Sequence, residues 1–501
     1  MCIRDRDTRY SNQIYTVYAA SKTGTNHFLV YFSSSSDKGS TWSIPVVVST
    51  GVPGMSDYDQ LSPSIVASTY TIHIVWHGRS SDFPAANSVW YSSANTVFGS
   101  WSVPSRVSVA ADMTNYEQLN PSIDASYFEI PYITWEGFSS VYPANSQIWF
   151  TTGAVGSWAM PERISTAAGM ELYLQSRPSI TCEYHDGNTD IIVAWHGRDS
   201  ANASQIFLTY MEEGVGGWEP VIRLSSLPAM DLREQKNVST CFSRGLAGFA
   251  WEGSTDTYKG IWFVYTNDGE DWSSPVCISE SFGDYDQYNP VLTVDDNGDI
   301  HAFWHGMSED YPASPQIWHS SHTYSDWQWY HPERVSTSGG NYYPSTARYS
   351  GDEISIIWTD NSSVLSEKLG YERNIWYTVF DSTDTLYWSD FNSGMWLKER
   401  LPQEGAKVYI LNGSSVVLSM NTPNLASIVV QEGATFYGNN MWYILNVGSA
   451  NAVGSINAKG FFDSGNAMIR TTSGTVKIFA EPPRFIYALE VGQGSTATIH
   501  T

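Results

Sequence analysis

The chain has 501 residues and carries 26 lysines and arginines against 51 aspartates and glutamates, which gives a formal net charge of −25. This charge argues against nucleic acid or an anionic membrane surface as a partner, because both would repel the protein. No stretch is long and apolar enough for membrane insertion, and the four cysteines follow no metal-binding or redox spacing.

The first nine residues are charged and lack the apolar segment of a signal peptide. We expect residues 1–9 to be disordered or artefactual and to contain no strand. The run 14–20 already matches the second strand of the later units, so the first unit lacks an opening strand in the sequence. We therefore expect the true start of the protein to be missing.

One segment, Ser35-Ser36-Asp37-Lys38-Gly39-Ser40-Thr41-Trp42, has the spacing S-x-D-x-G-x-x-W, and degraded copies of it recur along the chain. Each copy keeps a tryptophan that is followed seven residues later by a serine, and successive tryptophans are 54 to 60 residues apart. The pairs are Trp42/Ser49, Trp101/Ser108, Trp158/Ser165, Trp218/Ser225, Trp272/Ser279 and Trp329/Ser336, with a seventh copy expected at Trp388. The copy that contains Asp268 and Trp272 is one residue short of the full spacing. Most of the chain is therefore one repeated unit.

Each unit offers four short segments rich in β-branched and aromatic residues, which predict strands. The first contains a Pro-Ser pair, the second ends in Trp-His-Gly or Trp-Glu-Gly, the third is aromatic, and the fourth follows the box. Such repeats predict an all-β fold, a β-propeller of four-stranded blades over residues 10–390. Seven blades fit the count of copies. Six are the alternative, if the N-terminal unit completes a C-terminal one, and an array of β-sandwiches is the alternative fold.

The composition changes after about residue 390, where the repeats stop and Asn, Gly, Ser, Thr and Val dominate. Runs such as 431–435 and 494–498 are typical of a turn followed by a strand. We predict a smaller C-terminal all-β domain over residues 391–501, either a sandwich or the first rungs of a β-solenoid. The chain stops directly after a strand-like segment, so we expect this domain to be truncated.

The box at Ser35–Trp42 resembles the Asp-box of the bacterial neuraminidase repeat, and the repeated units resemble the sialidase superfamily of β-propellers. The resemblance implies that the box is a structural turn between the third and fourth strands of a blade. It implies that Ser35, Asp37 and Gly39 form the turn, that Trp42 packs inside, and that Asp268 and Trp272 play these roles in their own copy.

Strand parity then separates two faces of the propeller. The loops after the Trp-His-Gly or Trp-Glu-Gly motif and the links between blades must lie opposite the box turns. Aromatic rings beside carboxylates, amides and imidazoles suit sugars there, since rings stack on C–H surfaces and polar groups bond hydroxyls. The candidate ligand-binding residues are His77, Arg79, Glu136, Tyr142, His196, Arg198, Glu252, His305 and Tyr311 in the loops, and Tyr58, Asp59, Tyr116, Glu117, Tyr285 and Asp286 in the links.

A scaffold role is the alternative for these motifs, because a residue present in nearly every blade is more typical of structure than of a single site. In that interpretation the tryptophan packs at the blade interface, and the histidine or glutamate bonds a neighbouring backbone. The glycine then permits a positive φ, and the links join one blade to the next.

The sialidase resemblance implies an activity that needs three arginines, a tyrosine nucleophile, a glutamate base and an aspartate acid. The spacing selects no such set, and only Arg79 and Arg198 occupy equivalent loops. We therefore predict an exported or cell-surface, non-catalytic propeller that binds a glycan or polysaccharide. The alternatives are an exo-sialidase, another glycoside hydrolase or a polysaccharide lyase, and a structural adhesin segment. We expect no metal or other cofactor; calcium would suit the acidic loops, but no calcium-binding motif supports it.

Overall fold

The computed structural model describes most of residues 13–360 and the strands that follow. The described ranges are 13–21, 27–36, 42–96, 100–185, 187–200, 203–214, 216–255, 257–269, 271–295, 297–323, 329–336, 340–348 and 353–360, together with the strands at 2–3 and 374–500 given below. The chain divides into two compact units, Met1–Val379 and Phe380–Thr501. No helix in the described part of the chain is long and apolar enough to cross a membrane.

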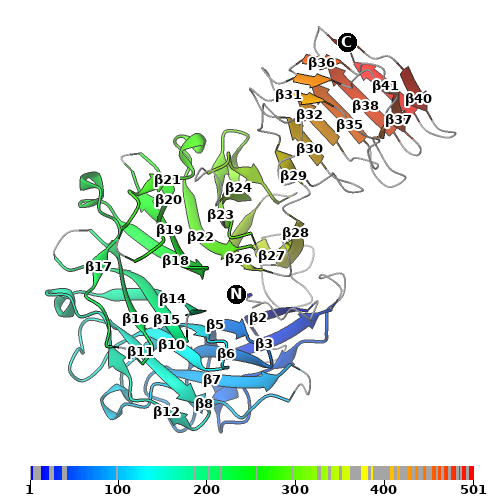
Figure 1. Cartoon of the computed structure of the whole chain (residues 1–501). Helices are drawn as coiled ribbons and strands as arrows, with labels where there is room; N and C mark the ends of the chain where they lie inside the picture. Colours follow the sequence, from blue (N-terminus) through cyan, green and yellow to red (C-terminus); the bar gives the residue numbers. More distant parts are fainter. Residues whose placement is uncertain are drawn as a thin grey trace. The chain divides into compact units, whose positions relative to one another are not determined.

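The first unit consists of small antiparallel sheets arranged around a central axis (Figure 1), numbered here sheets 1 to 7 in chain order. Sheet 1 contains β1 (Cys2–Ile3), β2 (Ile14–Ser21), β3 (Phe28–Ser35) and β4 (Val46–Val47). Sheet 2 contains β5 (Gln60–Ala67), β6 (Thr71–Gly78), β7 (Ser88–Asn95) and β8 (Ser105–Arg106), and sheet 3 contains β9 (Gln118–Ala125), β10 (Pro131–Gly137), β11 (Gln147–Ala154), β12 (Ser157–Trp158) and β13 (Glu162–Arg163).

The remaining sheets repeat this order. Sheet 4 contains β14 (Gln175–His185), β15 (Asn188–Gly197), β16 (Gln205–Glu212) and β17 (Ile222–Arg223). Sheet 5 contains β18 (Gln235–Ser243), β19 (Leu246–Ser254), β20 (Lys259–Thr266) and β21 (Val276–Cys277). Sheet 6 contains β22 (Gln287–Val294), β23 (Ile300–Ser308), β24 (Tyr311–His322) and β25 (Glu333–Arg334), and sheet 7 contains β26 (Asn341–Arg348), β27 (Glu353–Asp360) and β28 (Asn374–Asp381).

Sheet 1 differs from the other six at its first strand. The first strands β5, β9, β14, β18, β22 and β26 have eight residues or more, whereas β1 has two. The prediction of a β-propeller is confirmed, but counted by a full first strand the propeller has six blades rather than seven. Cys2–Ile3 pairs with β2, so the expectation that residues 1–9 contain no strand is wrong at these two positions. The rest of that stretch, like the expected seventh box copy, lies outside the described residues.

Large apolar side chains fill the space between neighbouring sheets. The tryptophans of the second-strand motif, Trp76, Trp135, Trp195, Trp251 and Trp304, are fully buried. Trp76, for example, belongs to a buried cluster with Val17 and Val30 of sheet 1 and Ile65 of its own sheet. A buried tryptophan removes roughly 200 Å² from water, which stabilises the fold by about 5 kcal/mol.

The repeated serine closes the fourth strand in sheets 1 to 6. In sheet 2 the Ser108 hydroxyl accepts a hydrogen bond of 3.2 Å from the backbone N–H of Val89. Equivalent bonds of 2.8–3.1 Å join Val30 to Ser49, Ile148 to Ser165, Ile206 to Ser225, Ile261 to Ser279 and Ile317 to Ser336. The serine hydroxyl therefore takes the place of a backbone hydrogen-bond acceptor from the neighbouring strand, at the point where the two-residue fourth strand ends.

One short 3-10 turn lies in each of five links between sheets and carries an apolar side chain inward. The turns are η1 (Met55–Asp57), η2 (Ala111–Met113), η3 (Met170–Leu172), η4 (Pro228–Met230) and η5 (Glu280–Phe282). Met55, Met113, Met170 and Met230 are buried, and Phe282 packs on Trp304 and Trp318. These buried side chains fix the links to the propeller, and so they also fix the position of the link residues that directly follow each turn.

The second unit has only parallel pairings among its described strands. One sheet has the order β29 (Thr385–Tyr387), β30 (Lys407–Ile410), β32 (Ser427–Val430), β35 (Gly454–Ala458), β38 (Thr475–Ala480) and β41 (Thr496–His500). The others contain β31 (Ser415–Val417), β33 (Thr435–Tyr437), β36 (Phe461–Asp463) and β39 (Arg484–Phe485), and β34 (Ile444–Asn446), β37 (Met468–Thr471) and β40 (Ala488–Val491). Such pairing is typical of β-solenoid rungs rather than of an antiparallel sandwich. A separate domain over residues 391–501 stays a prediction.

Candidate functional site

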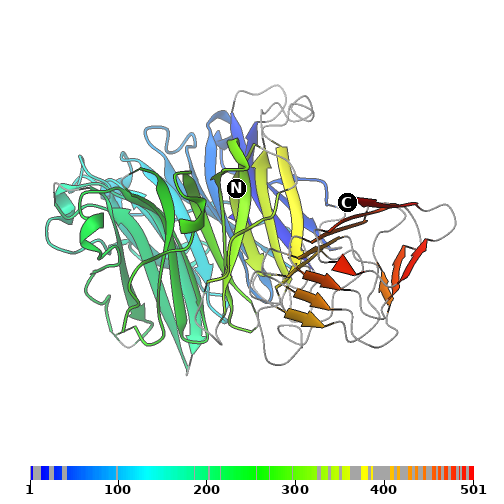
Figure 2. The same cartoon turned by 90° about the horizontal axis from the view of Figure 1, so that it is seen from above.

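The strand register defines the face of the propeller on which the candidate residues lie. The first residue of each first strand pairs with the last residue of the motif, as in Gln60 with Gly78 and Gln175 with Gly197. The links and the loops after the motif therefore share one face, here called the loop face, as strand parity predicts. Figure 2 shows the sheets from the side, with strands running between this face and the opposite one.

The motif tryptophan and the link glutamine that begins the first strand of the same sheet form a buried pair in five sheets. In sheet 4 the Trp195 Nε1 donates to the Gln175 Oε1 at 2.9 Å, while the Gln175 Nε2 donates to the backbone oxygen of Arg198 at 2.6 Å. The same Trp–Gln bond, 2.8–3.0 Å long, joins Trp76 to Gln60, Trp135 to Gln118, Trp251 to Gln235 and Trp304 to Gln287. The pair fastens the link to the end of the second strand.

The last position of the motif must be glycine because of this glutamine, and not because of a positive φ. None of the five motif glycines has a positive φ, so that prediction is wrong. A Cβ atom on Gly306 would lie 1.9 Å from the Gln287 Oε1 and 2.8 Å from the backbone oxygen of Asp286. A side chain is therefore excluded because the glutamine amide occupies its space.

The motif histidine or glutamate joins one sheet to the next. His196 Nδ1 accepts a bond of 3.3 Å from the backbone N–H of Asn237, and Glu136 Oε2 accepts one of 2.6 Å from that of Arg177. Equivalent bonds join His77 to Asn120, Glu252 to Asn289 and His305 to Tyr343. These are the contacts that the scaffold alternative predicts.

Burial keeps His77 and His196 neutral, as the accepting role requires. It lowers the pKa of His77 to about 4, and burial together with Arg177 and Lys236 lowers that of His196 to about 3. Burial also raises the pKa of Glu136, although four hydrogen-bond and charge contacts, including the N–H of Arg177, act against that rise. These groups hold the propeller together, and their ligand-binding role stays a prediction.

The predicted link acids contact the preceding sheet. Asp59 accepts from the N–H of Phe28 at 2.9 Å, Glu117 from that of Asn87 at 3.1 Å, and Asp286 from that of Lys259 at 2.8 Å. Each acid thus caps the start of a third strand. The carbonyl oxygens of Tyr58, Tyr116 and Tyr285 accept from the link glutamines.

Two predicted loop aromatics lie under arginines of the fourth strands. The guanidinium of Arg163 lies 4.7 Å from the ring centre of Tyr142, and that of Arg334 lies 4.6 Å from that of Tyr311. Both rings also pack near a tryptophan of their own sheet. Their ligand-binding role, too, stays a prediction.

The box residues Asp37 and Gly39 lie outside the described residues, and Ser35 and Trp42 flank them. The copy in sheet 5 is described except at residue 270, and it lies between β20 and β21. Asp268 Oδ1 accepts from the backbone N–H of Asp271 at 2.8 Å, and the Trp272 Nε1 donates to the Gly269 oxygen at 3.2 Å. The Trp272 ring packs on Phe249.

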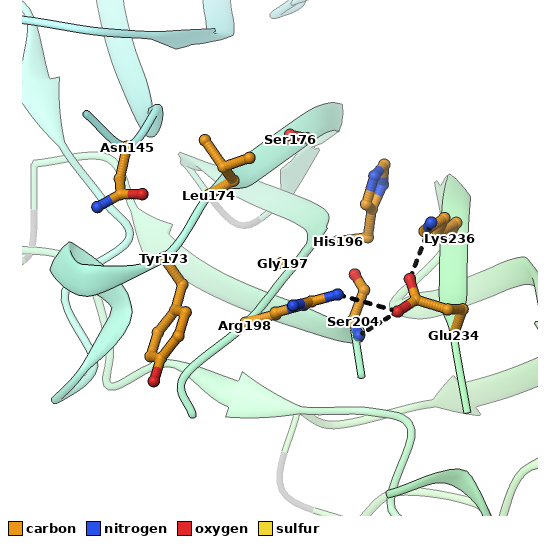
Figure 3. A pocket seen from close by; sticks show the side chains of 10 residues that line it. All are labelled: Asn145, Tyr173, Leu174, Ser176, His196, Gly197, Arg198, Ser204, Glu234 and Lys236. Carbon is orange, nitrogen blue, oxygen red and sulfur yellow. Dashed lines mark hydrogen bonds and ion pairs between the residues drawn. The ribbon is translucent and has the colours of Figure 1, made fainter. Parts of the chain in front are cut away.

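A cavity of about 410 Å³ lies between sheets 4 and 5 on the loop face (Figure 3). The predicted residues His196 and Arg198 line it, together with Tyr173, Ser176, Glu234 and Lys236 among others. Glu234 lies between two cations: Arg198 contacts its Oε1 at 3.1 Å, and Lys236 its Oε2 at 2.8 Å (Figure 3). The cavity therefore carries more positive than negative charge, in a protein of net charge −25.

The carboxylate in this cavity is held in its ionised form. Burial alone would raise the pKa of Glu234, but the hydrogen bond and charge of Lys236, with Arg198, outweigh burial and bring it below its ordinary value. His196 is neutral there. Among the described residues, no group of three or more His, Cys, Asp or Glu side chains is placed to hold a metal ion.

Sequence reasoning missed Lys236, Glu234 and Tyr173 as members of one site. Lys236 directly follows the link glutamine, where sheets 2 and 3 have Leu61 and Leu119. The link of sheet 4 has Leu174 where the other four links that carry the glutamine have an acid. Differences between the repeats, rather than the repeats themselves, were the signal that could have located the cavity.

No protein-family model and no curated protein sequence matches this chain. Solved structures that are similar to it include the polysaccharide lyase Uly1, with 12% identity, 75% of this chain and 88% of that chain covered, and a TM-score of 0.46. Another is the endosialidase of phage phi92, with 14% identity, 76% and 66% covered, and a TM-score of 0.43. A third is an α-L-arabinanase of Penicillium chrysogenum, with 14% identity, 64% and 93% covered, and a TM-score of 0.42.

Proposed function

We propose that this protein binds an anionic glycan through the loop face of its propeller, without cleaving it, at the cavity between sheets 4 and 5. The observation that carries the proposal is the pair of cations, Arg198 and Lys236, that share the single carboxylate of Glu234 beside a hollow. A carboxylate or sulfate of the glycan would take the unbalanced charge.

The other lining groups suit the remainder of a sugar. Tyr173 offers an aromatic ring for stacking, and Asn145 and Ser176 offer groups that bond hydroxyls. Glycans of this kind coat cells and fill the extracellular space, so an exported or surface-attached location belongs to the proposal.

The protonation states of the cavity favour binding over hydrolysis. A glycosidase needs a carboxyl group whose raised pKa lets it act as an acid. Glu234 has the opposite shift and is paired with both cations. Glu136, whose pKa is raised, is occupied by the N–H of Arg177 and the amide of Asn120.

Binding to a panel of polysaccharides in affinity electrophoresis tests the proposal. We expect polygalacturonate, alginate, hyaluronan or polysialic acid to retard the protein, and dextran and arabinan not to. The double variant Arg198→Ala/Lys236→Ala should weaken binding about tenfold or more, since loss of one charge-assisted contact is worth about 1.4 kcal/mol. Its melting should change little, because exposed ion pairs contribute about 1 kcal/mol or less.

Arg79 provides a matched control on the same face. It bonds Glu117 at 2.8 Å as Arg198 bonds Glu234, but it does not line the cavity. Arg79→Ala should therefore leave binding unchanged. Equal losses in both variants, or equal binding of neutral glycans, would contradict the proposal. Release of reducing ends or unsaturated sugars from a bound polysaccharide would show a glycosidase or lyase instead.

A further inference from the structure

Six first strands share one unusual backbone position. Two residues after the link glutamine, or after Asn341 in sheet 7, the chain adopts a left-handed conformation with φ between 47° and 54°. The residues are Ser62, Asn120, Arg177, Asn237, Asn289 and Tyr343. Asparagine tolerates this conformation, whereas a bulky side chain is disfavoured in it. Arg177 and Tyr343 thus depart from the local preference, and such departures gather at functional positions.

Tyr343 belongs to an aromatic group on sheets 6 and 7. The rings of Tyr288, Tyr342 and Tyr343 surround the buried His305, with centroid distances to its ring of 5.6, 5.5 and 5.4 Å. Tyr343 is 44% exposed, and its N–H is held by the His305 Nδ1. Lys259 places its Nζ 4.7 Å from the ring centre of Tyr288. Rigid aromatic rings with hydroxyl edges and a nearby cation suit an anionic sugar.

Hydrogen bonds connect this aromatic group with the cationic cavity. The Arg177 guanidinium donates to the Asn237 Oδ1 at 3.2 Å, and the Asn237 amide donates to the Asn289 Oδ1 at 3.2 Å. The Asn289 N–H reaches Glu252, which lies 3.7 Å from the Nζ of Lys259. The first strands β14, β18, β22 and β26 that carry these residues are successive neighbours. Cα atoms of successive first strands lie within 8 Å of one another, and three such steps separate β14 from β26. The row is therefore longer than one sugar ring is wide.

We infer that the ligand is a chain of several sugars, which enters the cavity at Arg198 and Lys236 with one acidic unit and stacks a later unit on Tyr288, Tyr342 and Tyr343. The inference rests on the proposed function and adds to it the polymeric nature of the ligand and a second subsite.

The test uses a variant that restores the repeat. Tyr343→Asn creates the Asn-Pro pair already present at 120–121 and 289–290, so it should melt no lower than the parent protein. It should weaken binding to the acidic polysaccharide about tenfold. Tyr127→Asn, which removes a tyrosine that is 68% exposed in the turn between β9 and β10 on the opposite face, should leave binding unchanged. In a competition assay, a hexasaccharide fragment of the bound polysaccharide should displace the polysaccharide from the protein at a concentration at least about tenfold lower than the monosaccharide needs.

Two results decide between the proposals. Retained binding in Tyr343→Asn, with monosaccharide and hexasaccharide equally effective, overturns this inference while the cationic cavity stands. If no acidic polysaccharide binds the parent protein, the proposed function fails and this inference with it. Tyr288→Leu, which restores the leucine found in sheets 2 and 3, gives the same readout if Tyr343→Asn fails to fold.

Discussion

Gly306→Ala is expected to lower the free energy of unfolding by about 4 kcal/mol. The new methyl group would lie 1.9 Å from the Gln287 Oε1, so the amide must leave its place. The Trp304 Nε1 then loses its acceptor at 3.0 Å, and the carbonyl oxygens of Tyr285 and Met307 lose their donor. Chemical denaturation, which measures the free energy of unfolding, checks the prediction.

Gly217 is the matched control for this change. A Cβ atom at Gly217 would meet no atom within 4 Å, and this residue has no positive φ. Gly217→Ala should therefore leave stability unchanged or raise it slightly, because alanine restricts the unfolded chain. If both variants lost the same stability, the glutamine pair would not be the reason for the motif glycine.

Acid is expected to unfold the propeller steeply between pH 6.5 and pH 4. Burial lowers the pKa of His73 and His77 to about 4 and that of His196 to about 3, while the unfolded chain binds these protons near pH 6.5. Stability from the neutral imidazoles is complete above pH 6.5 and is lost as the pH falls toward the folded values. At 1.36 kcal/mol per pKa unit the three together amount to on the order of 10 kcal/mol, comparable with the whole stability of a domain.

His77→Gln should reduce this acid sensitivity. A glutamine oxygen can still accept from the N–H of Asn120, so stability at neutral pH should change little. The slope of unfolding free energy against pH should fall by about 1.4 kcal/mol per pH unit between pH 4 and pH 6.5. An unchanged slope in His77→Gln would show that other groups govern acid unfolding.

The fold could be predicted because its repeat consists of large residues, above all tryptophan, at a regular spacing. The spacing of tryptophan and serine located the third and fourth strands, since Trp272 and Ser279 have fixed places in their blade. The first sheet was harder, because residues 14–20 fit a second strand and the sequence does not show that Cys2–Ile3 pairs with them. The contribution of such a short strand depends on its neighbours rather than on its own residues.

The candidate site was predictable only in part, for a physical reason. Repeated residues are visible in a sequence, but in this propeller they make the buried contacts that every sheet needs, as His196 and Gln175 show. The residues that break the repeat, such as Lys236 and Tyr343, are single occurrences without a pattern of their own. The grouping of Arg198, Glu234 and Lys236 depends on how neighbouring sheets meet, which no spacing encodes.

The left-handed position on each first strand has a consequence for how this surface can change over time. In five of these strands the backbone N–H at this position donates a hydrogen bond to a histidine or glutamate of the preceding sheet. The side chain at the position is not the bonding group, so arginine, asparagine or tyrosine can occupy the same backbone. The side chain at this position can therefore be substituted in one blade without loss of the hydrogen bonds that hold the blades together. Under the proposed function, a few substitutions at these positions would exchange one recognised polymer for another, with the architecture of the protein unchanged.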